Sequence, residues 1–286
     1  MMWDENYQSN KKSINALIED VKEATTGMLS VPVYLRYSEY ARNLFAGNIF
    51  DVGTGQGGST ISLALGLKMN PVRSSQHYVY ALDQFYQRKQ GGPHPFCLAD
   101  HDCINRNIAA FKANLERFNV ENIVKVIPGE LKGFPVELNE DTDIGLLVID
   151  TDGYIDRDFD IFFDKVPNNG IIIVDDYANK VNPSGRKNLA AVEGLTKLET
   201  EGYVNGLKNN RFSGGARILG KHKLTFELAQ YYMSRGAIEL LEVISDTLFA
   251  RKTTTEKYRS LIDPDQVAYI KDKLQQDFID LALRKR

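Results

Sequence analysis

The sequence predicts a doubly wound α/β fold, in which helices cover both faces of a mostly parallel β-sheet. Five short apolar runs alternate with helical stretches, and their sequences are "NIFDV", "HYVYALDQF", "IVKVIPG", "IGLLVID" and "GIIIVDDY". The runs are apolar throughout, which is typical of parallel strands buried on both faces. A glycine-rich turn follows the first run, and carboxylates follow the fourth and fifth. Because such sheets bind ligands beyond the carboxyl ends of their strands, we expect the functional residues there.

The chain divides into three predicted parts. Residues 1–46 read as an N-terminal helical cap, with Ile14, Leu17, Ile18 and Val21 at helical spacing and a break at Pro32. Residues 47–220 hold the strand and helix alternation. Residues 221–286 lack glycine-rich turns, and "ELAQYYMSRGAIELLEVISDTLFARK" and "DPDQVAYIKDKLQQDFIDLALRKR" read as amphipathic helices. We therefore expect a C-terminal helical appendage, which either covers the core, forms a dimer surface or acts as a substrate lid.

Composition excludes several classes of protein. The 286 residues are 43% hydrophobic and 26% charged, which suits a chain with a sizeable core. A net charge of −3 without a basic excess disfavours nucleic acid as a partner. We find no apolar run long enough for a membrane span and no apolar signal core near the N-terminus, so we expect a soluble, cytoplasmic protein with no membrane partner.

The two cysteines indicate a reducing compartment, since two thiols make no disulfide framework. Cys97 and Cys103 lie close to His94 and His101, so a zinc site has to be considered. Their spacing fits no common zinc pattern. A polar loop with incidental thiols is the favoured interpretation.

The stretch "DVGTGQGGST" is the first candidate binding element. Its glycines permit positive φ and close approach of a ligand to the backbone, as NAD, FAD, nucleotides and S-adenosylmethionine (SAM) all require. Asp51 precedes the glycines; it suits a ligand ammonium and would repel a pyrophosphate. Asp83 ends the next run, where a carboxylate either binds both hydroxyls of a ribose or caps a helix.

Two pairs of carboxylates form the second candidate element. Asp150 and Asp152 follow the fourth apolar run, and Asp175 and Asp176 follow the fifth. Adjacent parallel strands would bring the four together, where their repulsion raises their pKa values unless a hard divalent cation such as Mg²⁺ relieves it. The alternative interpretation is that they are caps and solvated loop residues.

These stretches together resemble class I SAM-dependent methyltransferases, and are most similar to the macrocin O-methyltransferase family of tylosin-type sugar O-methyltransferases. The resemblance covers residues 47 to about 192 and rests on "GNIFDVGTGQGGS", "VYALDQF", "NLERFNVENIVKVIPGELKGFP", "LLVIDTDGY" and "NNGIIIVDDYANKVNPSGRKNLAAV". It implies a Rossmann-like, seven-stranded sheet, SAM as the methyl donor and a divalent metal, usually magnesium.

The resemblance also implies roles for individual residues. The implied SAM-binding residues are Asp51, Gly53, Thr54, Gly55, Gly57, Ser59, Asp83, Gln84, Phe85, Gly129, Glu130 and Asp150. The implied metal ligands are Asp150, Asp175 and Asp176. Asp152, with Asp150 beside it, is the candidate catalytic residue that takes the proton of the acceptor. His94 or His101, on a long loop, is the alternative base.

The sequence therefore predicts a metal-dependent SAM O-methyltransferase. Its partner would be a small-molecule acceptor, bearing the hydroxyl of a vicinal diol, sugar or phenol in a natural product or glycan. Departures from the family near the acceptor pocket, such as Gly153 after Asp152, leave the acceptor open. The alternatives are a nicotinamide-dependent oxidoreductase on the same fold and a non-catalytic binding module. The helical C-terminal region is compatible with a homodimer.

Overall fold

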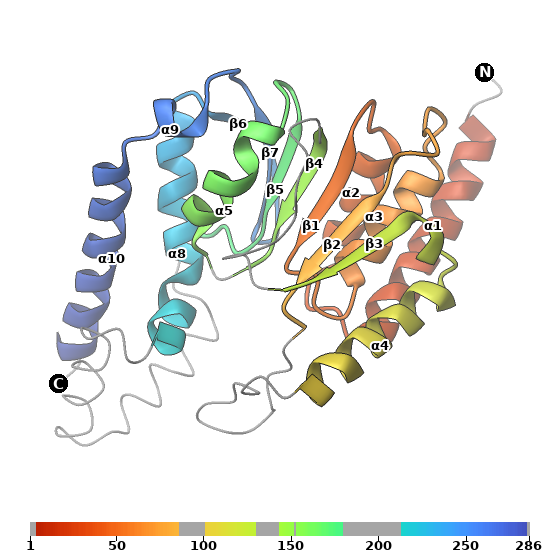
Figure 1. Ribbon diagram of the computed structural model, residues 1–286, viewed down its shortest axis with the longest axis horizontal. Helices are drawn as coiled ribbons and strands as arrows, with labels where there is room; N and C mark the ends of the chain where they lie inside the picture. Colours follow the sequence, from red (N-terminus) through yellow and green to blue (C-terminus); the bar gives the residue numbers. More distant parts are fainter. Residues whose placement is uncertain (1–3, 86–100, 130–142, 152, 180–212, 285–286) are drawn as a thin grey trace. The chain divides into compact units, whose positions relative to one another are not determined.

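A computed structural model of the chain describes residues 4–85, 101–129, 143–151, 153–179 and 213–284 (Figure 1). The chain divides into two compact units, Met1–Val148 and Ile149–Arg286, and each is described by itself. Within the described residues, no helix is long and apolar enough to cross a membrane.

The first unit carries the first half of the sheet and the N-terminal helices. Its elements in chain order are α1 (Asp4–Ala24), α2 (Val31–Arg42), β1 (Asn48–Val52), α3 (Gly58–Lys68), β2 (Val79–Asp83), α4 (His101–Arg117), η1 (Glu121–Ile123), β3 (Val124–Pro128) and β4 (Ile144–Ile149). Parallel pairing sets Asp51 beside Ala81 and Asp83 beside Pro128. Strands β1, β2 and β3 therefore end at a common edge (Figure 1).

The second unit is built on an antiparallel pairing. Its elements are α5 (Ile155–Phe162), η2 (Phe163–Lys165), β5 (Ile171–Val174), α8 (Ser213–Ser234), β6 (Ile238–Ile244), β7 (Thr247–Lys252), α9 (Tyr258–Leu261) and α10 (Pro264–Arg284). Strand β7 runs antiparallel to both β5 and β6. Between α5 and α8, the rings of Phe159 and Tyr232 stack with centroids 5.0 Å apart, and this stack forms part of the unit's core.

The strand order is β3-β2-β1-β4-β5-β7-β6 in one seven-stranded sheet. Strands β2 and β3 lie on one side of β1 in this order. Strands β4 and β5 and the β6–β7 pair, which come later in the chain, lie on the other side. This order is that of a doubly wound α/β sheet, which confirms the predicted fold class. The expected N-terminal helices are present as α1 and α2, with Pro32 in the first turn of α2.

The sequence predicts that residues 221–286 are mostly helical, and the predicted amphipathic helix through "ELAQYYMSRGAIELLEVISDTLFARK" is wrong in its second half. Residues Ile238–Ile244 and Thr247–Lys252 form a β-hairpin that completes the sheet, although α8, α9 and α10 are helices. The apolar spacing of "ELLEVI" fits either a helix or a strand, and long-range pairing of β7 with β5 decides between them. Gly236, with a φ of +68°, follows the end of α8 and separates the helix from the hairpin. The predicted helix in "GRKNLAAVEGLTKL" lies outside the described residues.

Helix α3 shows why this part of the chain is rich in small residues. Nearly all of its residues are buried, and α2 packs closely against it. A Cβ on Gly66 would lie 2.1 Å from the carbonyl oxygen of Ser38. Only glycine therefore allows the two helices to reach this separation.

We expect Gly66→Ala to destabilise the protein, because the added methyl group would force α2 and α3 apart. Overpacking of this kind costs about 1–3 kcal/mol in the free energy of unfolding, which urea denaturation would measure. Lys68→Ala, at the exposed end of the same helix, is the control and should change that free energy by less than about 0.5 kcal/mol. Equal stability of Gly66→Ala and the wild type would contradict the close approach of the helices.

Candidate functional site

The glycine-rich turn joins β1 to α3 in the first unit. Gly53, Gly55 and Gly57 have φ values of +94°, +54° and +101°. These left-handed conformations suit glycine and turn the chain sharply from the strand into the helix. The N-terminus of α3 begins at Gly58, so backbone N–H groups and the positive end of the helix dipole lie beside the turn.

Asp51 is the buried carboxylate of this turn. Its side chain is fully buried, and its Oδ2 accepts hydrogen bonds from Ser59 Oγ at 2.8 Å and from the hydroxyl of Thr60. Burial raises the pKa of Asp51 to about 6, and the two hydroxyl donors partly offset that rise. Among the described residues its Oδ1 has no hydrogen-bond partner, and neither has the buried hydroxyl of Thr54. Water, an ion or a ligand commonly supplies the missing partners of such buried polar atoms.

Asp83 ends β2 and ties the turn to the neighbouring loop. Its Oδ2 accepts a hydrogen bond from the N–H of Gly55 at 2.8 Å, and its Oδ1 accepts one from the N–H of Phe85 at 2.6 Å. Burial raises the pKa of Asp83, and these hydrogen bonds partly offset the rise. Each carboxylate oxygen keeps a second lone pair, so Asp83 retains acceptor capacity for a ligand.

The remaining predicted cofactor residues surround Asp83 as far as the structure describes them. Gln84 is exposed, whereas Phe85 is buried with its ring 5.3 Å from that of Phe111. The N–H of Gly129, just after β3, donates to the carbonyl oxygen of Asp83 at 2.9 Å. Glu130 lies outside the described residues.

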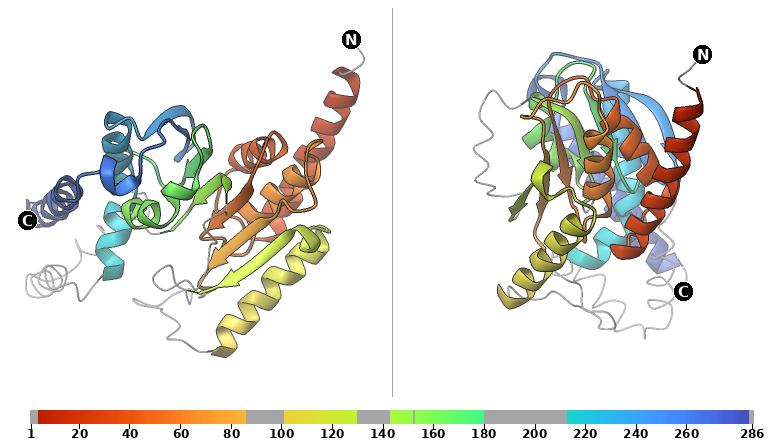
Figure 2. Two further views of the ribbon diagram at one scale, coloured as in Figure 1. Left: turned by 45° about the horizontal axis from the view of Figure 1, so that its top comes forward. Right: turned by 90° about the vertical axis from the view of Figure 1, so that its right-hand side faces the viewer.

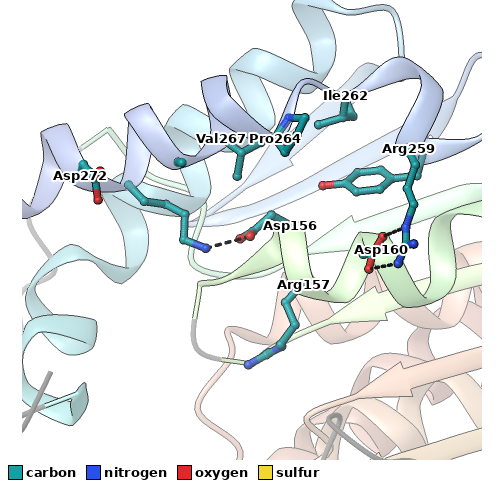
Figure 3. A pocket seen from close by; sticks show the side chains of 11 residues that line it. Asp156, Arg157, Asp160, Arg259, Ile262, Pro264, Val267 and Asp272 are labelled. Atoms are coloured by element: carbon teal, nitrogen blue, oxygen red, sulfur yellow. Dashed lines mark hydrogen bonds and ion pairs between the residues drawn. The ribbon is translucent and has the colours of Figure 1, made fainter.

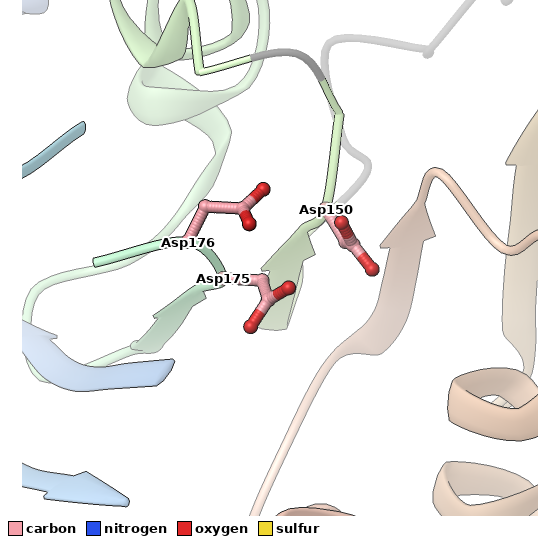
Figure 4. Close-up of side chains that lie close together, drawn as sticks. All are labelled: Asp150, Asp175 and Asp176. Atoms are coloured by element: carbon pink, nitrogen blue, oxygen red, sulfur yellow. The ribbon is translucent and has the colours of Figure 1, made fainter. Parts of the chain in front are cut away.

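Three predicted metal ligands come together in the second unit (Figure 4). Asp150 follows β4, and Asp175 and Asp176 follow β5. One carboxylate oxygen from each lies within 4.8 Å of the others. The predicted clustering of these three carboxylates is confirmed, and their role as metal ligands remains a prediction. Asp152, the fourth of the predicted set, lies outside the described residues, as do His94 and the side chain of His101.

The carboxylates after β5 are held by residues distant in sequence. Thr247 Oγ1 donates to Asp175 Oδ1 at 2.7 Å, and His222 Nε2 donates to Asp176 Oδ1 at 2.8 Å. Asp246 Oδ2 faces His222 Nδ1 at 3.6 Å. Sequence reasoning missed all three of these residues. No spacing signal could have found them, because the fold alone brings α8 and the β6–β7 turn to β5.

The donor set fits a hard divalent cation. Three partly buried carboxylates offer only oxygen ligands, which Mg²⁺, Mn²⁺ and Ca²⁺ prefer. Without a cation, charges this close repel one another. A bound divalent cation would relieve this repulsion.

A separate cavity of about 610 Å³ lies between α5, α9 and α10 (Figure 3). Two ion pairs join its walls: Lys271 with Asp156 at 2.8 Å, and Arg259 with Asp160 at 2.8 Å. The three clustered carboxylates do not line this cavity, so it is not part of the carboxylate cluster.

Comparison with known proteins agrees with the fold. One similar solved structure is a putative caffeoyl-CoA O-methyltransferase from Staphylococcus aureus, 14% identical, with a TM-score of 0.51 over 87% of this chain and 96% of that chain. Another is the O-methyltransferase TomG from Streptomyces achromogenes, involved in tomaymycin synthesis and solved with SAM; it is 13% identical, with a TM-score of 0.51 over 89% of this chain and 100% of that chain. At these identities the likeness shows the fold alone.

Sequence comparison finds a similarity to one protein family. No curated protein matches the chain. Residues 50–177 match a family model described as a methyltransferase domain, and this segment includes both the glycine-rich turn and the carboxylates after β4 and β5. Residues 50–177 are therefore similar to this methyltransferase-domain family.

Proposed function

We propose that this protein is a SAM-dependent O-methyltransferase that uses a divalent cation held by Asp150, Asp175 and Asp176. The observation that carries the proposal is the cluster of three carboxylate oxygens within 4.8 Å, in a chain similar to a methyltransferase family. Such a cluster is unfavourable unless something compensates its charge. Similarity to the methyltransferase family disfavours the alternative of a nicotinamide-dependent oxidoreductase.

The glycine-rich turn is the proposed binding site for the methionine part of SAM. The unpartnered Oδ1 of Asp51 and the hydroxyl of Thr54 offer acceptors for its ammonium group. The remaining lone pairs of Asp83 suit the two ribose hydroxyls. The SAM complex of TomG supports SAM as the donor.

The proposed reaction is a displacement at the methyl carbon of the sulfonium. The acceptor oxygen forms a bond to that carbon while the carbon–sulfur bond breaks, which leaves S-adenosylhomocysteine. The acceptor proton passes to a carboxylate, for which the sequence proposes Asp152 with Asp150 beside it. When bound, a divalent cation would lower the pKa of the acceptor hydroxyl and fix its direction.

The proposed acceptor is a small molecule bearing a vicinal diol, sugar or phenol hydroxyl, in a natural product or glycan. Two neighbouring oxygens suit a cation with open coordination positions, because both can bind it at once. The similar structures support an oxygen acceptor, because both are O-methyltransferases: one is involved in tomaymycin synthesis, and the other is a putative caffeoyl-CoA O-methyltransferase.

We expect SAM to bind more weakly as the pH falls below 6. Burial raises the pKa of Asp51 to about 6, so this carboxylate is mostly ionised at pH 7 and mostly protonated at pH 5. The SAM ammonium stays charged over this range and requires the ionised carboxylate. The affinity should therefore fall about tenfold between pH 7 and pH 5, as isothermal titration would measure.

Asp51→Asn should bind SAM weakly, with little dependence on pH. A wild-type affinity that stays constant from pH 7 to pH 5 would argue against contact between Asp51 and the ammonium.

We expect Asp175→Asn to change stability in opposite directions with and without metal. Removing one of the three charges relieves repulsion, so the metal-free variant should have a higher melting temperature than the wild type. Added Mg²⁺ should raise the melting temperature of the wild type and have little effect on the variant. Thermal denaturation in EDTA and in excess Mg²⁺ would measure both effects.

Asp272→Asn, on the exposed side of α10, is the control for the loss of one negative charge and should respond to Mg²⁺ like the wild type. A wild-type protein whose melting temperature does not respond to Mg²⁺, Mn²⁺ or EDTA would refute the proposed metal site. SAM affinity measured in the same samples separates that result from failure of the methyltransferase proposal itself.

A further inference from the structure

We propose that His222 is a positioning residue for the metal site, which it serves by orienting the carboxylate of Asp176. This inference rests on the proposed metal role of Asp150, Asp175 and Asp176. It assigns a function to α8, which lies outside the segment that matches the methyltransferase family.

The geometry at Asp176 is the first observation. His222 Nε2 lies 2.8 Å from Asp176 Oδ1, at hydrogen-bond distance, and the imidazole is buried with 8% of its side chain exposed. Asp176 has a φ of +60°, a left-handed conformation that few residues other than glycine adopt. The backbone turns sharply at Asp176, and the buried imidazole fixes one oxygen of the carboxylate that this turn presents.

Helix α8 is anchored to the segment after β5 over more than one turn. Phe226, four residues after His222, packs its ring 5.1 Å from that of Tyr177. Gln230, four residues further, donates from Nε2 to the hydroxyl of Tyr177 at 2.7 Å. Residues spaced by four lie along one face of a helix. The contacts of this helix face with Tyr177 therefore hold His222 next to Asp176.

The turn between β6 and β7 also contacts the segment after β5. The N–H of Tyr177 donates to the carbonyl oxygen of Asp246 at 2.6 Å, and Asp246 Oδ2 lies 3.6 Å from His222 Nδ1. Thr247, the next residue, donates to Asp175. Both carboxylates after β5 thus receive a side-chain hydrogen bond from the region after residue 221.

Hydrogen bonds to the ligands of a metal hold those ligands in the binding geometry, and losing one typically weakens metal binding by about 10–100-fold. His222 occupies this position with respect to Asp176. Replacing His222 should therefore change the affinity for the cation. It should leave the affinity for SAM unchanged, because the glycine-rich turn is built from other residues.

Two substitutions separate the hydrogen bond to Asp176 from the contact with Asp246. The amide nitrogen of glutamine reaches the position of His Nε2, whereas that of asparagine lies near the position of Nδ1. His222→Gln should therefore keep the donor to Asp176, and His222→Asn should lose it. Glu227→Gln, at a partly exposed position on the same helix where Glu227 pairs with Lys223, is the control.

The probe is Mn²⁺, whose free ion is counted directly by electron paramagnetic resonance, and SAM affinity is measured on the same samples. We expect His222→Asn to raise the Mn²⁺ dissociation constant about tenfold or more. His222→Gln and Glu227→Gln should stay close to the wild type. All variants should keep the wild-type SAM affinity, which shows that they are folded.

A double mutant provides the second measurement. If His222 acts through Asp176, adding His222→Asn to Asp176→Asn should weaken Mn²⁺ binding no further. Unchanged Mn²⁺ affinity in His222→Asn, equal loss in the Gln and Asn variants, or full additivity in the double mutant would each overturn the inference. A wild type that binds SAM and no Mn²⁺ would instead refute the proposed metal site, and the inference with it.

Discussion

The repulsion among Asp150, Asp175 and Asp176 is the constraint on which the rest of the second unit depends. Three carboxylates with oxygens within 4.8 Å of one another cost free energy in the metal-free protein. A folded chain can maintain such a cluster only if other interactions hold each carboxylate in place. The segment directly after β5 supplies the backbone of two of them, and hydrogen bonds from Thr247 and His222 hold their side chains.

This constraint gives the C-terminal hairpin and α8 a role beyond completing the sheet. Strand β7 pairs with β5, and this pairing brings the β6–β7 turn to the end of β5 where the carboxylates lie. Helix α8 approaches the same end through Phe226 and Gln230. Two carboxylates inside the matched segment 50–177 are therefore held by side chains that follow that segment.

In the glycine-rich turn of the first unit, hydroxyl donors stabilise the buried carboxylate of Asp51. Ser59 and Thr60 from the first turn of α3 satisfy one oxygen of Asp51, and the nearby carboxylate of Asp83 adds to the rise of its pKa. The other oxygen of Asp51 and the hydroxyl of Thr54 have no partner among the described residues. An anion that is buried, partly satisfied and beside a helix N-terminus suits a zwitterionic ligand such as the methionine part of SAM.

The sequence by itself determined the doubly wound sheet, the glycine-rich turn and the clustering of the three carboxylates. Strand ends and glycine turns are local signals, and parallel pairing places the ends of successive strands at one edge. Only the tertiary structure decided that residues 238–252 are strands, because the apolar spacing of that stretch fits a helix equally well and pairing with β5 selects the strand. The same holds for His222, Asp246 and Thr247. His222 and Thr247 contact the carboxylates from more than 40 residues away, and Asp246 contacts His222. No local pattern encodes a contact that depends on packing between distant elements.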